Sequence, residues 1–226
     1  MKKISTGTLN GIFTIALAFT ITAVILFLAS AEISSSNFFI SIYLDRWTHY
    51  SPIYAYGNLM LVLFFLTGIY LTGKHSKNYI PILLIITIGF PIVYTLLTIP
   101  IFGDLGSKGF SGIASGYFGY LVWMTYISIL NRSQKEDSTF MKTTWFLAAL
   151  ATITIASLPL EPHVASVLAD GSYVVKNVWA HYLGYAFGLL VPTLICIIKK
   201  EKFESCVTET GVYGLFFITL KIVLTI

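Results

Sequence analysis

The chain has 226 residues, of which 56% are hydrophobic and only 11% are charged, and its formal net charge is +4. Long runs almost without charge recur along it, which excludes a soluble globular domain and predicts an all-α polytopic membrane protein. The positive charge comes from lysines between the apolar runs, where it orients a membrane protein, so it does not indicate nucleic-acid binding.

The first apolar run follows Lys2 and Lys3 and extends from Gly11 to Ala29. Because a helix needs roughly 20 apolar residues to cross a bilayer, this run is long enough to span. The tripeptide Ala29-Ser30-Ala31 resembles a signal-peptidase site, but the run is longer than the about 7 to 15 residues usual in a signal peptide. We therefore expect a retained first helix.

Six further apolar runs predict seven spans in all. They cover about Pro52–Leu71, Tyr79–Ile101, Ser111–Leu130, Thr144–Leu160, Val178–Ile198 and Gly211–Ile226. The third span contains Pro81, Pro91 and Pro100, so we expect it to be kinked or irregular. No internal repeat or disordered linker divides the sequence. Residues 1–226 are therefore expected to form one membrane-embedded domain, with a core at about 10–200 and an additional C-terminal helix at about 211–226.

The distribution of lysine and arginine predicts the orientation, because cytoplasmic segments are enriched in these residues. Ten of them lie in one set of alternating segments: Lys2, Lys3, Lys74, Lys77, Arg132, Lys135, Lys142, Lys199, Lys200 and Lys202. Only three lie in the other set: Arg46, Lys108 and Lys176. We therefore expect a multi-pass protein of the cell (plasma) membrane with a cytoplasmic N-terminus. Its second, fourth and sixth helices then start at the outer face.

Polar side chains gather near the outer ends of these three helices. Ser111 and His181 each lie within about one turn of the outer end, and Asn58 lies nearly two turns into the second helix, one turn beyond Tyr54. Ionisable side chains inside a membrane usually mark function, and a serine beside a histidine can be a nucleophile with its base. The alternative is structural, because serine and histidine also occur as ordinary helix-contact residues.

Glycines at regular spacing form a face of small residues on the fourth and sixth helices. They are Gly112, Gly116, Gly119, Gly184 and Gly188. Such small-x-x-x-small faces let helix backbones approach closely, although as packing motifs alone they say little about function. If the two faces meet, Ser111 and His181 come within hydrogen-bonding range, as proton transfer between them requires.

These motifs resemble those of the rhomboid family of intramembrane serine proteases. The family's G-x-S-G around the nucleophile matches Gly109 to Gly112, and its A-H-x-x-G-x-x-x-G matches Ala180 to Gly188. Of the H-x-x-x-N motif on the second helix only Asn58 is present, because Tyr54 occupies the histidine position. His49 falls where some members carry an additional histidine. The resemblance covers roughly the first six helices, and the seventh resembles the extra C-terminal helix of some members.

The resemblance implies a six-helix rhomboid-like core with a seventh helix, and a Ser111–His181 dyad without a carboxylate. The dyad would hydrolyse peptide bonds in or near transmembrane segments of membrane proteins through an acyl-enzyme. The Ser111 N–H and the Asn58 amide would hold the oxyanion, and Gly109 belongs to the same substrate-binding region. Tyr54 puts one oxyanion donor in doubt, although a phenol can also donate. The expected partners are transmembrane substrates and the lipid bilayer, with no metal, cofactor or nucleic acid.

Other functions stay open. A catalytically inactive rhomboid-like protein would bind transmembrane helices without cutting them, which Tyr54 favours and the presence of both Ser111 and His181 disfavours. A processing enzyme for one class of tail, as in the rhombosortase branch, is also consistent with the motifs. A transporter is disfavoured because no paired charges lie at mid-membrane, and a metalloprotease because H-E-x-x-H is absent. The outer segment with His163 and Asp170 is interpreted as a polar loop.

Overall fold

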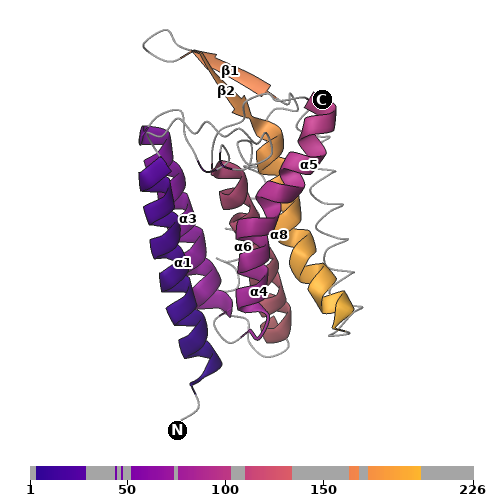
Figure 1. The fold of residues 1–226 in the computed structure, drawn as a ribbon. Coiled ribbons are helices and arrows are strands. Elements are labelled where there is room, and N and C mark those ends of the chain that lie inside the picture. The colour runs from indigo at the N-terminus through magenta and orange to yellow at the C-terminus, as the bar shows by residue number, and fades with distance from the viewer. Residues whose placement is uncertain are drawn as a thin grey trace.

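The computed structural model describes residues 4–28, 44, 47, 52–73, 76–102, 110–133, 163–167 and 173–199. These residues form a bundle of long helices with a two-stranded hairpin at one end (Figure 1). The helical elements are α1 Thr6–Leu28, α3 Pro52–Gly73, α4 Tyr79–Leu84, the π-helical turn η1 Ile85–Gly89, α5 Phe90–Phe102, α6 Ser111–Ser133 and α8 Val178–Ile198.

Four helical segments in this described part are long and apolar enough to cross a membrane. They are Thr6–Leu28, Ala55–Gly73, Tyr79–Leu97 and Ala180–Ile198. The prediction of a helical membrane protein is confirmed at this level, and four expected helices begin at the predicted residues, Pro52, Tyr79, Ser111 and Val178. The expected spans at 144–160 and 211–226 lie outside the described residues.

The first helix begins at Thr6 rather than at Gly11, because polar residues before the apolar run find partners. The Ser5 side chain accepts a hydrogen bond from the Thr8 backbone N–H at 3.1 Å, which is an N-cap. Further along, the buried Asn10 side chain donates to the Ser76 carbonyl at 3.0 Å. The helix can therefore include polar positions that an apolar run does not reveal.

The expected irregularity of the third span is confirmed, and it takes the form of the π-helical turn η1 between α4 and α5. Thr87 in this turn donates its hydroxyl hydrogen to the Leu83 carbonyl at 2.6 Å. The Tyr117 hydroxyl of α6 lies 2.5 Å from the same Thr87 oxygen, so Tyr117 is the donor in that second bond. A buried hydroxyl pair thus connects the π-helical turn to α6.

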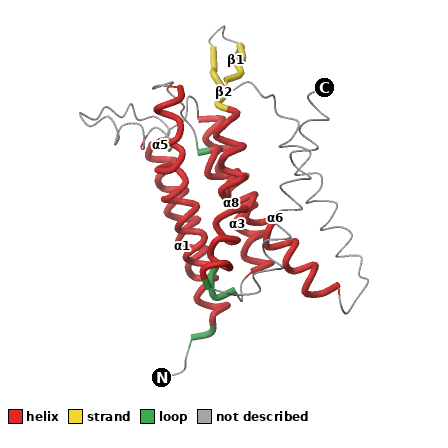
Figure 2. Tube along the Cα trace, turned by 90° about the vertical axis from the view of Figure 1, so that its right-hand side faces the viewer, coloured by secondary structure: helices red, strands yellow, loops and turns green. Residues whose placement is uncertain are grey.

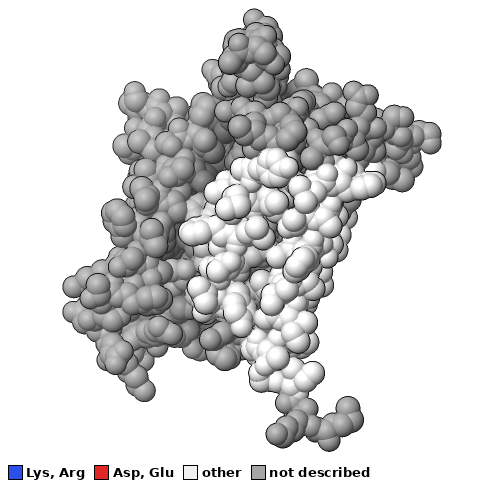
Figure 3. Space-filling view, turned by 90° about the vertical axis from the view of Figure 1, so that its left-hand side faces the viewer, with Lys and Arg blue, Asp and Glu red and all other residues white. Residues whose placement is uncertain are grey.

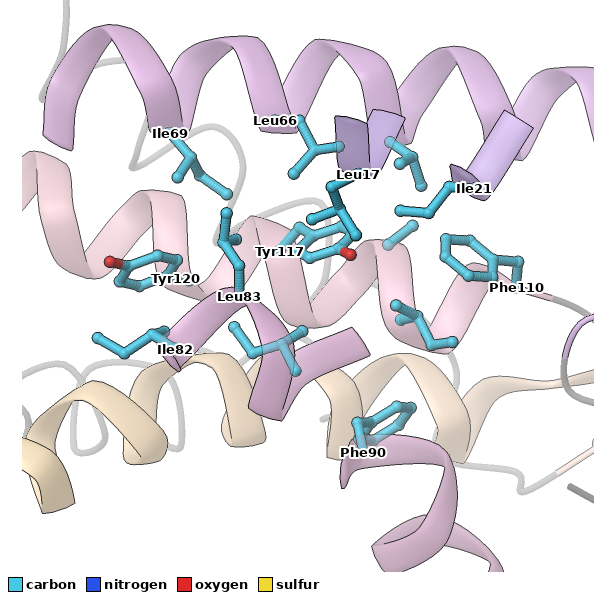
Figure 4. Close-up of a cluster of buried hydrophobic side chains, with 14 of the residues drawn as sticks. Leu17, Ile21, Leu66, Ile69, Ile82, Leu83, Phe90, Phe110, Tyr117 and Tyr120 are labelled. Atoms are coloured by element: carbon cyan, nitrogen blue, oxygen red, sulfur yellow. The ribbon is translucent and has the colours of Figure 1, made fainter. Parts of the chain in front are cut away.

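The central helix is α6, which lies between α3 and α8 (Figure 1). All six residues from Gly112 to Tyr117 are buried, as expected for a helix surrounded by others. Side chains of α1, α3 and α4 point toward Tyr117 and Tyr120 of α6 in one apolar cluster (Figure 4).

The outer surface of α1 and α3 is suited to lipid. Large apolar side chains such as Phe19, Phe27 and Phe64 are 68% to 81% exposed. On the described face formed around α1, the space-filling view contains neither basic nor acidic side chains (Figure 3). At the far end of α8, Lys199 donates to the Asn78 side chain, which joins the end of α8 to the start of α4.

A β-hairpin precedes α8, so the interpretation of this segment as a polar loop was wrong. Strands β1 His163–Val167 and β2 Tyr173–Asn177 pair antiparallel, with Ala165 opposite Val175. Strand β2 continues directly into α8, and the hairpin lies at the end of the bundle opposite the N-terminus of α1 (Figure 2). The valines in both segments favour the pairing, because β-branched side chains fit a pleated strand.

Candidate functional site

Helices α6 and α8 cross with their backbones in direct contact. A Cβ atom at Gly184 would lie 2.0 Å from the Gly112 carbonyl oxygen, and one at Gly188 would lie 2.0 Å from that of Gly116. A Cβ atom at Gly119 would lie 2.2 Å from a carbonyl oxygen of α8. Only glycine fits at these positions, so the expected meeting of the two small-residue faces is confirmed.

The three helices that carry the candidate residues run in the same direction. The glycine contacts between α6 and α8 advance together along both chains, which makes these helices parallel. The contacts of α3 with α6 advance in the same way, because a Cβ atom at Gly68 would meet Leu121 at 3.0 Å and one at Gly73 would meet Met124. Helices α3, α6 and α8 therefore start at one end of the bundle, as the orientation argument expected.

Aromatic rings from the three helices contact one another across the bundle. The Phe118 ring of α6 stacks on Phe65 of α3, with centroids 5.1 Å apart and planes at 25°. On its other side it contacts Tyr185 of α8, with centroids 5.5 Å apart. The set formed by Phe65, Phe118 and Tyr185, called here the aromatic layer, connects the three helices, and its stacked Phe65–Phe118 pair gives the relative height of α3 and α6.

The candidate residues lie one or two turns above the aromatic layer, toward the start of each helix. Asn58 and Ser111 each precede their phenylalanine by seven residues, about 10.5 Å along parallel helices, so they lie level. Gly112 is beside Ala180, since a Cβ atom at Gly112 would lie 3.2 Å from the Ala180 carbonyl oxygen. Their chain neighbours Ser111 and His181 therefore lie level as well.

The faces on which these residues stand also correspond. Ser111 is two turns from Phe118 and so lies within about 20° of the same face, which is turned toward α3 and α8. His181 is one turn before Tyr185, whose ring faces Phe118. The structure thus brings Asn58, Ser111 and His181 to one end and one interior face of the helix triplet.

Ser111 is partly accessible, and the residue before it is held by packing. The side chains of Asn58, Ser111 and His181 are each half-buried. The preceding Phe110 is fully buried and packs on Trp47 with ring centroids 4.9 Å apart.

The start of α6 leaves backbone donors at Ser111. The first backbone hydrogen bond of the helix runs from Ala114 N–H to the Phe110 carbonyl at 3.0 Å. The N–H groups of residues 111–113 therefore precede the helical hydrogen-bond ladder. N–H groups in the first turn of a helix can bind negative charge.

The remaining candidate residues are only partly or not at all described. The backbone of Tyr54 lies in the first turn of α3, one turn before Asn58, but its side chain lies outside the described residues. Gly109 and His49 also lie outside them. Among the residues that the structure describes, no three histidine, cysteine, aspartate or glutamate side chains gather to hold a metal ion.

No protein-family model matches the chain, and neither characterised proteins nor solved structures gave a match.

The aromatic layer was not predicted from the sequence. Its signal is nevertheless present, because Phe65 and Phe118 repeat the positions of Asn58 and Ser111 after seven residues, and Tyr185 repeats that of His181 after four. Helical periodicity applied downward from the candidate residues would have found all three rings.

Proposed function

We propose that this protein is a rhomboid-type intramembrane serine protease, which hydrolyses peptide bonds in or near transmembrane segments of other membrane proteins. The observation that carries the proposal is the level arrangement of Asn58, Ser111 and His181 on three parallel helices. Direct backbone contact between α6 and α8 keeps the helices of serine and histidine at a fixed separation. A nucleophile and its base must stay within hydrogen-bonding distance of each other, because the base takes the proton of the nucleophile directly.

In this mechanism Ser111 attacks the scissile carbonyl while His181 takes the hydroxyl proton. The carbonyl oxygen becomes an oxyanion, which the Ser111 N–H and the Asn58 amide stabilise by donating hydrogen bonds. His181 then gives its proton to the leaving amine, and an acyl-enzyme remains on Ser111. A water molecule deprotonated by His181 hydrolyses this ester and regenerates both residues.

The proposal includes the architecture and the location of a rhomboid-type enzyme. The described helices would belong to a six-helix core with a seventh C-terminal helix, and the N-terminus would be cytoplasmic in the plasma membrane. The ten-to-three distribution of lysine and arginine and the common direction of α3, α6 and α8 support this arrangement. The site would then open toward the outer face, where water is available for deacylation.

The second candidate is a catalytically inactive relative that binds transmembrane helices. Tyr54 favours it, since this residue stands where the family has a histidine that contributes to the oxyanion hole. A phenol hydroxyl is still a hydrogen-bond donor, so the tyrosine weakens rather than removes the case for catalysis.

The deciding experiment is labelling of the purified protein with a serine-directed fluorophosphonate, followed by mapping of the adduct. We expect an adduct on Ser111 that is lost in Ser111→Ala and His181→Ala, and labelling about 10²- to 10³-fold slower in Asn58→Ala, which lacks one oxyanion donor. The control is Thr67→Ala, which removes an exposed hydroxyl bonded only to its own helix, at the Leu63 carbonyl. A protein that binds transmembrane peptides but neither labels nor cleaves them would establish the inactive relative instead.

A further inference from the structure

The two sides of α6 are held by different kinds of contact. Helix α8 meets α6 with backbone against backbone at the glycines, and this contact limits how closely the two helices can approach. Helix α3 instead meets α6 through side chains, among them Phe118, Leu121 and Met124. The distance of α3 from α6 therefore depends on the size of these side chains.

Phe118 is the member of this set that stands nearest to Ser111 along α6. Leu121 and Met124 lie about one and two turns further from the candidate site. Phe118 also contacts both neighbours, since its ring lies against Phe65 of α3 and Tyr185 of α8. Its ring is therefore the spacer closest to the level of the candidate residues.

We propose that Phe118 is a positioning residue, which holds α3 at the distance that places the Asn58 amide at the oxyanion. This inference rests on the proposed function, because it concerns the same site. Phe118 touches neither substrate nor reacting atoms; it acts through Asn58, two turns above its stacking partner Phe65. Removing the ring lets α3 move against α6, and a displacement of about 1 Å in a catalytic group can cost about 10²-fold in rate.

A double-mutant cycle separates this role from ordinary packing. Cleavage rates would be compared for the wild type, Phe118→Ala, Asn58→Ala and the double variant in the same detergent or vesicles. We expect Phe118→Ala to lower kcat by about 10²-fold with a smaller change in KM. We expect Asn58→Ala to add little to this loss, since Asn58 is already misplaced. Full additivity of the two losses would overturn the proposal.

Two further variants serve as controls for the double-mutant cycle. Phe118→Leu retains bulk at the position, so we expect it to recover part of the rate, and it carries the test where the alanine variant does not fold. Phe64→Ala removes a ring that also neighbours Phe65, at 5.8 Å, but is 68% exposed. This control is expected to stay within about twofold of the wild type, because exposed substitutions rarely perturb a structure.

A measurement without catalysis distinguishes failure of this inference from failure of the proposed function. Cysteines at positions 58 and 111, in a chain with Cys196 and Cys206 replaced by alanine, would be bridged by bis-thiol reagents of graded length. If Phe118 sets the spacing, Phe118→Ala or Phe118→Leu changes the reagent length that bridges best, and Phe64→Ala does not. An unchanged length overturns the inference. A changed length, together with a wild-type protein that the fluorophosphonate never labels at Ser111, would support Phe118 as the spacer and refute the proposed protease function.

Discussion

Adding a single methyl group at Gly184 tests the backbone contact on which the candidate site depends. In Gly184→Ala the new Cβ atom would lie 2.0 Å from the Gly112 carbonyl oxygen and 3.3 Å from the Gly116 nitrogen. Ordinary contact begins at 3.4 Å, so the helices must separate by about 1.4 Å or distort. Both obstacles are backbone atoms, which cannot turn away as a side chain can.

The expected cost follows from this overlap. Overpacking a well-packed site costs about 1 to 3 kcal/mol, and the backbone obstacles place Gly184→Ala near the upper end. Replacing glycine by alanine inside a helix returns about 1 kcal/mol. We therefore expect the free energy of unfolding to fall by about 2 kcal/mol.

Gly57→Ala is the matched control, since a Cβ atom at that position of α3 would meet nothing within 4 Å. It gains the helix propensity without overlap and is expected to be stabilised by up to about 1 kcal/mol. Gly112→Ala should fall between the two, because its nearest obstacle is the edge of the Phe90 ring at 2.8 Å. Unfolding in mixed micelles, followed by tryptophan fluorescence, would measure all three variants. Equal stability of Gly184→Ala and Gly57→Ala would refute the backbone contact.

Three other outcomes are expected. Ser111→Ala and His181→Ala should each abolish cleavage of a transmembrane substrate in gel-based assays, and the double variant should be little worse. Strictly additive losses of rate would show that the two residues do not act as a unit. Tyr54→Phe should lower kcat by about 10²-fold or more if the phenol replaces the family histidine as donor, and an unchanged kcat would remove Tyr54 from the oxyanion hole. Thr87→Val should destabilise the fold by about 1 to 3 kcal/mol, because it leaves the Tyr117 hydroxyl buried without its acceptor. The double variant Thr87→Val with Tyr117→Phe should be more stable than Thr87→Val alone, and the reverse order would contradict that account.

The helix positions were largely predictable, because a membrane-spanning segment must be helical, so the helix has nearly the same bounds as the apolar run. Helices α3, α6 and α8 begin at the residues where their runs begin. The start of α1 was not predictable from hydropathy, since it depends on the Ser5 cap and on Asn10 reaching Ser76. The π-helical turn was predicted only as an irregularity, because prolines interrupt the hydrogen-bond ladder without specifying what replaces it.

For the candidate site, spacing along the sequence predicted which helix faces meet but not how the helices are separated. The glycine spacing on α6 and α8 was sufficient to predict their contact, because helix faces without side chains can approach until the backbones touch. The distance of α3 depends on which rotamer Phe118 adopts between Phe65 and Tyr185, and rotamers are decided by the assembled core. The hairpin was missed because this segment was considered only as polar surface, and the valines of both strands were not weighed.

The common direction of α3, α6 and α8 has an electrostatic consequence. Peptide dipoles add along a helix and leave about half a positive elementary charge at its N-terminus and half a negative one at its C-terminus. Three such N-termini lie at the end where Ser111 stands, so the backbone itself favours negative charge there before any side chain contributes. At the other end the C-terminus of α8 favours positive charge, and Lys199 occupies that position. Because α1 runs antiparallel to α3 and finishes where α3 starts, the effect is local, and it is the first turn of α6 that favours negative charge beside Ser111.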